Sequence, residues 1–116
     1  MKKLVYLLVL ALIVVVSYSE KVYATGAIAI SDEDEMYGVC TGADGKDEAK
    51  SCAVKACKDH GGTDCKFRVW FEKCGAVAES HKYFGIGWGK DKETAESKAL
   101  DDCAHNCTIV ASECEK

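Results

Sequence analysis

The stretch YFGIGWGKDKETAESKALDDC, residues Tyr83–Cys103, decides the fold. Side chains alternate between the two faces of a β-strand. The glycines at alternate positions from Gly85 to Gly89 therefore share one face, and Phe84 and Trp88 point to the other. A glycine-lined face admits a close neighbour. The segment that follows is rich in alanine, so we predict that an alanine-rich helix packs directly on the glycine face.

The same pattern occurs earlier in the chain. Four kinds of segment recur in the same order. A strand of small residues (Gly26–Ser31 and Gly75–Ser80) is followed by an aromatic–glycine strand (Tyr37–Gly42 and Phe84–Gly89). An alanine-rich helix (Lys46–Cys57 and Lys92–Cys103) and a strand that begins at a cysteine (Cys65–Phe71 and Cys107–Ser112) come next. This order indicates an internal repeat. We predict one small α+β domain of two tandem strand–strand–helix–strand units, residues 26–73 and 74–116, with the helices packed on antiparallel sheet.

Residues 1–24 have the features of a secretory signal peptide. Lys2 and Lys3 precede the apolar run Leu4–Val16, which is shorter than the roughly 20 residues of a membrane-spanning helix. Val22, Tyr23 and Ala24 place small or tolerated residues at the positions that a signal peptidase reads, so we expect cleavage after Ala24. We therefore predict a secreted or periplasmic protein of residues 25–116, without stable membrane insertion after cleavage. An uncleaved anchor is the alternative.

Charge limits the classes of partner. Without the charged residues of the signal (Lys2, Lys3, Lys21 and Glu20), the totals of 15 basic and 19 acidic residues become 12 and 18, a net charge of −6. Nucleic acids and anionic membrane surfaces require a basic footprint, so we expect neither as a partner. The acidic run Asp32–Glu35 is expected to form a solvated turn, because it lacks the alternating oxygen ligands and the glycine of a calcium loop.

All eight cysteines lie in residues 25–116. A domain of this size is marginally stable on core burial alone, and an even number of cysteines on a secretory route favours disulfides. The repeat predicts the pairing, because Cys57 and Cys65 bracket the same helix-to-strand loop in unit one as Cys103 and Cys107 do in unit two. We expect the bonds 57–65 and 103–107.

Two further bonds complete the expected set. Cys40 and Cys52 lie on the facing sides of a strand and a helix, and both of their counterparts in unit two lack sulfur. Their joint appearance favours a 40–52 bond. Cys74 and Cys114 are the remaining pair, which would tie the first and last strands of unit two.

Zinc is the alternative reading of the cysteine–histidine clusters. His60 lies between Cys57 and Cys65, and His105 lies between Cys103 and Cys107. The cysteine pairs are duplicated between the units, but the two histidines are not aligned. An oxidising compartment also favours disulfides over thiolate ligands. We therefore expect no metal and no cofactor.

The sequence offers weak candidates for a functional surface. Arg68 and Trp70 are expected to share a face of their strand, which makes them candidate binding residues together with Tyr83. We expect Phe84 and Trp88 to belong to the core, because large apolar side chains are usually mostly buried. The glycines of GIGWGKDKE lack the order of a nucleotide-binding loop, so we favour their packing role.

The assembled motifs resemble a known family. GAIAIS, DCKFRVWFEKCGAVA and YFGIGWG, with the two alanine-rich helices, are similar to the bacterial domain of unknown function 4189, from Gly26 to Cys114. The resemblance implies export and a disulfide-bridged α+β domain of two units, and it supplies no activity or catalytic residues. The chain departs from the family pattern in Cys40 and Cys52, which look like an added bond, and in its richness in lysine and glutamate.

We expect a non-enzymatic, disulfide-rich interaction protein whose partner is another protein or an envelope component. An inhibitor, an immunity protein or a secreted effector fits this description. The alternative is a small secreted hydrolase or metal-binding protein, for which His81 beside Glu79 is the candidate acid–base pair. We rank it lower because the chain shows no nucleophile motif and its cysteines are assigned to disulfides.

Overall fold

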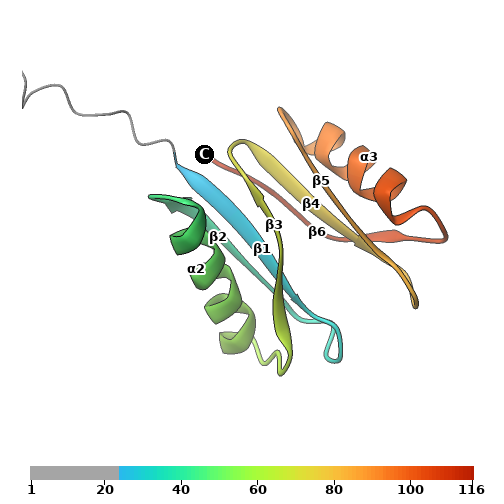
Figure 1. Ribbon diagram of the computed structural model, residues 1–116, viewed down its shortest axis with the longest axis horizontal. Coiled ribbons are helices and arrows are strands. Elements are labelled where there is room, and N and C mark those ends of the chain that lie inside the picture. The colour runs from blue at the N-terminus through green and yellow to red at the C-terminus, as the bar shows by residue number, and fades with distance from the viewer. Residues whose placement is uncertain (1–23) are drawn as a thin grey trace, which may run out of the picture.

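The computed structural model describes residues 24–116, so the predicted signal peptide lies almost entirely outside the described residues. The described chain forms eight elements in two consecutive sets (Figure 1), with these bounds: β1 (Thr25–Ser31), β2 (Tyr37–Ala43), α2 (Lys46–Asp59), β3 (Cys65–Phe71), β4 (Cys74–Glu79), β5 (Phe84–Gly89), α3 (Lys92–Cys103) and β6 (Thr108–Cys114). The predicted strand–strand–helix–strand order of both units is confirmed. No helix within residues 24–116 is long and apolar enough to cross a membrane.

Each unit is a three-stranded antiparallel sheet with one helix on a face. The strand orders are β2-β1-β3 and β5-β4-β6, so the first strand of each unit lies in the middle. Small residues of β1 and β4, together with alanines of the covering helix, form the two thin cores under α2 and α3. Figure 1 shows the helices on the two outer sides and the sheets between them.

The predicted contact between the glycine face and the helix is confirmed. A Cβ added to Gly85 would lie 2.3 Å from the carbonyl oxygen of Ala99, and one added to Gly87 would lie 2.1 Å from that of Ala95. Gly38 has the same role on β2, opposite α2. Because these positions carry no side chain, the helix backbone rests directly on the strand.

The main core lies between the two sheets. Its members come from both units, and they are apolar residues of β1, β3, β4 and β6: Ile28, Ile30, Val69, Phe71, Val77 and Ala111. The ring of Phe71 fills the space over two equivalent glycines, since a Cβ on Gly26 or Gly75 would lie within 2.5 Å of it. Each sheet therefore covers the inner face of the other.

The four disulfides join the predicted cysteine pairs, 40–52, 57–65, 74–114 and 103–107. Cys40–Cys52 and Cys57–Cys65 tie α2 to β2 and β3, and Cys103–Cys107 ties the end of α3 to the loop before β6. Cys74–Cys114 links directly opposed residues of β4 and β6. None of the cysteines is free. The bonds fix each helix to its sheet, where the small residues of the helix contribute little buried area.

Candidate functional site

A groove of about 590 Å³ runs along the outer edge of β3. Every residue from Phe67 to Cys74 lines it, whereas a groove over one face of a strand would be lined by alternate residues only. Ile86 and Trp88 of β5 also contribute, as does Lys46 at the start of α2. β3 and β5 are both edge strands, so the groove lies where the edges of the two sheets meet. Its volume is within the range of ligand-binding pockets.

Aromatic rings are exposed in and beside this groove. Trp70 is 38% exposed, Phe84 47% and Trp88 56%. The prediction that Phe84 and Trp88 belong to the core is therefore wrong. Both lie on the face of β5 opposite the glycines, but on this edge strand only the middle residue, Ile86, packs against the core between the sheets. The rings at both ends remain accessible to a partner.

Arg68 occupies a bulge of β3. The register between β1 and β3 shifts at this point, and Arg68 has no partner residue on β1. A bulge re-aims the side chains around it. Trp70 lies opposite Ala27, which belongs to the core under α2, whereas the Cζ atom of Arg68 lies 3.9 Å from the centroid of the Phe84 ring. The prediction that Arg68 and Trp70 share a face is therefore wrong.

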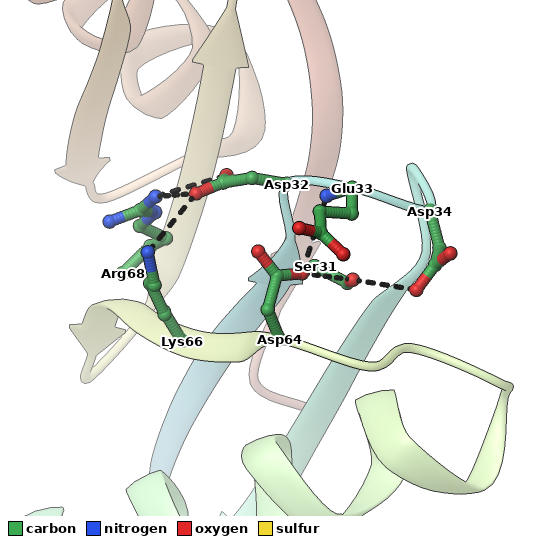
Figure 2. Close-up of polar contacts among 7 residues, drawn as sticks. All are labelled: Ser31, Asp32, Glu33, Asp34, Asp64, Lys66 and Arg68. Carbon is green, nitrogen blue, oxygen red and sulfur yellow. Dashed lines mark hydrogen bonds and ion pairs between the residues drawn. The ribbon is translucent and has the colours of Figure 1, made fainter.

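Asp32 holds the guanidinium of Arg68 in place (Figure 2). Nη2 of Arg68 donates to Oδ1 and Oδ2 of Asp32 at 3.0 and 2.8 Å, and Nζ of Lys66 lies 3.7 Å from the same carboxylate. The Arg68 side chain is only 13% exposed. Stacking on one side and an ion pair on the other therefore fix this wall of the groove.

Two lysines of α2 lie over aromatic rings of β3. Nζ of Lys46 is 5.4 Å from the ring centroid of Trp70, and Nζ of Lys50 is 5.2 Å from that of Phe67. Within residues 24–116, neither lysine forms an ion pair with a carboxylate. The helix side of the β3 edge therefore carries unpaired positive charge, although the protein from residue 25 onward is acidic.

The acidic run Asp32–Glu35 forms the exposed turn between β1 and β2, as predicted. The hydroxyl of Ser31 donates to Asp64 at 2.6 Å, and the hydroxyl of Thr63 donates to Asp34 at 2.6 Å. These hydrogen bonds lower the pKa of both carboxyl groups. The carboxylates thus tie this turn to the loop that leads into β3 (Figure 2).

Glu79 lies at the end of β4, on the side that faces the other sheet. Partial burial raises the pKa of its carboxyl group, and the nearby charge of Asp32 raises it further, while Arg68 acts in the opposite direction. In unit one the equivalent position is the buried Ile30. This carboxyl group is therefore a polar replacement at the margin of the core.

The three histidines lie on separate exposed segments. Nδ1 of His60 is 2.9 Å from the carbonyl oxygen of Tyr37, His81 lies in the turn after β4, and His105 lies in the loop after α3. The cysteines beside His60 and His105 are in disulfides. Residues 24–116 contain no group of three or more histidine, cysteine or carboxylate side chains placed to hold a metal ion.

Of the predicted binding residues, the structure brings Arg68 and Trp70 to the groove. Tyr83 is 54% exposed but lies in the turn before β5, with its ring 6.4 Å from that of His105, and it does not line the groove. Sequence reasoning missed Trp88 and Lys46 as groove residues. The alternation of glycines gave the correct face for Trp88, but it carried no information on where the opposite sheet ends.

Comparisons with known proteins identify the family. Residues 25–114 match the domain of unknown function DUF4189, and the chain belongs to this family. None of the curated proteins matches the sequence. The NMR structure of Rv1813c from Mycobacterium tuberculosis is similar, with 24% sequence identity and a TM-score of 0.59 over 84% of this chain and 79% of that chain. At this identity the similarity shows the fold alone.

Proposed function

We propose that this DUF4189 protein is an exported, non-enzymatic binding protein, and that it recognises another protein or an envelope component through the groove between β3 and β5. The observation that carries this proposal is the exposure of Trp70 and Trp88, which line the groove, together with Phe84 beside it, which stacks on the groove residue Arg68. Tryptophan and arginine are the residues that most often dominate the energy of protein interfaces.

The rigidity of the groove supports a role in recognition. Disulfides hold α2 against β2 and β3, and Asp32 and Phe84 hold Arg68. A surface that is fixed before binding loses little conformational entropy when a partner arrives. What the groove presents is apolar contact area with positive charge along one side, and the histidines lie outside its lining.

Capture from the host envelope and medium tests the proposal. The tagged full-length protein, Trp70→Ala and Trp88→Ala would each be expressed in the host, cross-linked gently and analysed for retained proteins or envelope polymers. We expect a component that the unmodified protein retains and that both groove variants lose. Tyr83→Ala is the matched control, because Tyr83 is an exposed aromatic residue outside the groove lining.

Two results would count against the proposal. Equal retention by the groove variants and the unmodified protein would show that the groove is not the contact surface. Loss of retention by Tyr83→Ala as well would show a general effect of removing exposed aromatics. Circular dichroism and the absence of free thiols would establish that each variant is folded.

A further inference from the structure

We propose that the groove takes an extended peptide segment, which adds to the outer edge of β3 as a further strand and whose side chains alternate between acidic and apolar. This inference rests on the proposed function and names the chemistry of the partner. It follows from three features of β3, namely its open backbone edge, the lysines on one side of that edge and the apolar wall on the other.

The backbone of β3 is open along the groove. β3 pairs with β1 on one side only, and the described residues supply no other hydrogen-bond partner to the backbone of Lys66–Phe71. On the edge strand β5, by contrast, the amide of Ile86 donates to a carboxylate oxygen of Asp102. Unpaired edge groups are a template for strand addition.

The two sides of this edge differ in chemistry. Lys46 and Lys50 lie on the helix side, over the rings of Trp70 and Phe67. The opposite wall of the groove, on the β5 side, carries Trp88 with Ile86 beside it, and Arg68, whose charge is already paired with Asp32. Side chains of an added strand would alternate between these two environments.

The charge and polarity of the two sides indicate which side chains an added strand would place on each of them. Carboxylates fit the helix side, because Lys46 and Lys50 have no acidic partner in residues 24–116. Apolar side chains fit the β5 side, where they would cover the exposed indole of Trp88. A strand of alternating acidic and β-branched apolar residues satisfies both requirements when one of its residues spans Arg68 and Val69, as Ile28 of β1 does on the other side of β3. A shift by one residue reverses every side chain.

Synthetic peptides provide the direct test. The probe is a capped peptide of four Glu-Val repeats, and the control is a capped peptide of the same composition with the four glutamates first and the four valines last. Binding to the disulfide-bonded protein would be followed by calorimetry and by tryptophan fluorescence. We expect the alternating peptide to bind at least about tenfold more tightly, because only it matches both sides of the edge.

N-methylation separates strand pairing from general attraction. In an added strand, every second amide points toward β3. One alternating peptide would carry N-methyl groups on all its glutamates, and a second on all its valines. We expect one of them to lose binding by roughly tenfold or more and the other to bind as the unmethylated peptide does.

Charge reversal on α2 tests the acidic side. Lys46→Glu and Lys50→Glu are each expected to weaken the alternating peptide by roughly fivefold, because attraction becomes repulsion at an exposed site. Lys55→Glu is the matched control, since it makes the same charge change on the same helix, about 140° around the axis from Lys50. Equal weakening by all three variants would show that peptide binding depends only on the net charge of the protein. It would overturn the placement of the acidic side chains beside Lys46 and Lys50.

Other outcomes would overturn the inference as a whole. They are equal binding of the alternating and block peptides, no binding of either, or equal effects of the two methylation patterns. Concentration-dependent dimerisation that Trp88→Ala abolishes would instead assign the edge to a second copy of the chain. If capture from the host still depends on Trp70 and Trp88 while no peptide binds, the strand-addition inference fails and the proposed function stands.

Discussion

Gly87 shows how a missing side chain positions a helix. The backbone of α3 occupies the space that a Cβ would need, at 2.1 Å from the carbonyl oxygen of Ala95 and 2.5 Å from the amide nitrogen of Ala99. Both neighbours are backbone atoms, so they cannot move without moving the helix. The fold of unit two therefore depends on the absence of a side chain at this residue.

Gly87→Ala is expected to destabilise the protein by roughly 2–3 kcal/mol, since overpacking at a close backbone contact forces the elements apart. For a domain of this size, that lowers the melting temperature by roughly 10–20 °C. Gly45→Ala is the control, because a Cβ at Gly45 meets no atom within 4 Å. It should cost at most about 1 kcal/mol, as a helix N-cap substitution. Similar losses in the two variants would contradict the packing role of Gly87.

Glu79 gives a pH dependence of known sign. Its folded-state pKa is raised above the ordinary value of 4.5, so the folded protein binds the proton more tightly than the unfolded chain does. Its contribution to stability is therefore fully present below about pH 4.5 and declines as the pH rises through the folded pKa. Asp34, Asp64 and Asp91 have lowered pKa values and act in the opposite sense, with stability lost as the pH falls below 3.8.

Glu79→Gln isolates the first effect. The variant cannot ionise at this position, so its melting temperature relative to the unmodified protein should increase between pH 4 and pH 7. Thermal melts followed by circular dichroism at half-unit steps of pH would measure the difference. A difference that stays constant with pH, or that decreases toward pH 7, would show that the folded state does not disfavour the ionised carboxyl group.

Among the elements, the strands and helices themselves could be predicted from the sequence. The duplicated segments placed the eight elements, and the alternating glycines gave the face on which α3 packs. The exposure of Trp88 to solvent could not be predicted in the same way. Periodicity assigns a side chain to a face, but its burial depends on how far the opposing sheet extends.

The bulge in β3 explains the other error. Alternation along an unbroken strand would place Arg68 and Trp70 on one face, yet the extra residue at Arg68 changes the parity of the strand. The equivalent strand β6 has the same shift in its pairing with β4, between Val77 and Ala78. The bulge is therefore part of the repeat, but the sequence contains no glycine or other local signal that marks it.

Disulfides of different span should contribute differently to stability. Cys74–Cys114 joins residues 40 apart in the chain, whereas Cys103–Cys107 joins residues 4 apart. If restriction of the unfolded chain dominates, the two bonds contribute about 4 and about 2 kcal/mol. Replacing each pair by alanine and measuring urea unfolding should show the larger loss for the long-range pair, and the reverse order would contradict the chain-entropy explanation.

At the scale of the whole molecule, the two units are mutually dependent. Each helix covers only one face of its sheet, and the remaining face is covered by the sheet of the other unit. Phe71, from the end of unit one, lies over Gly26 of its own unit and over Gly75 of the next. Separation of the units would expose this entire central core to water, which is strongly unfavourable.

The units should therefore unfold together. The two tryptophans of the chain report on the two units separately, Trp70 in unit one and Trp88 in unit two. Trp88→Phe leaves a probe in unit one, and Trp70→Phe leaves a probe in unit two. In each variant we expect the fluorescence transition to coincide with the transition seen by circular dichroism, because small domains that share one core unfold in a single step.

A fluorescence midpoint that differs clearly from the circular dichroism midpoint in either variant would mean that one sheet and its helix persist without the other. In that case the disulfides within each unit, and not the core between the sheets, would be the main source of stability.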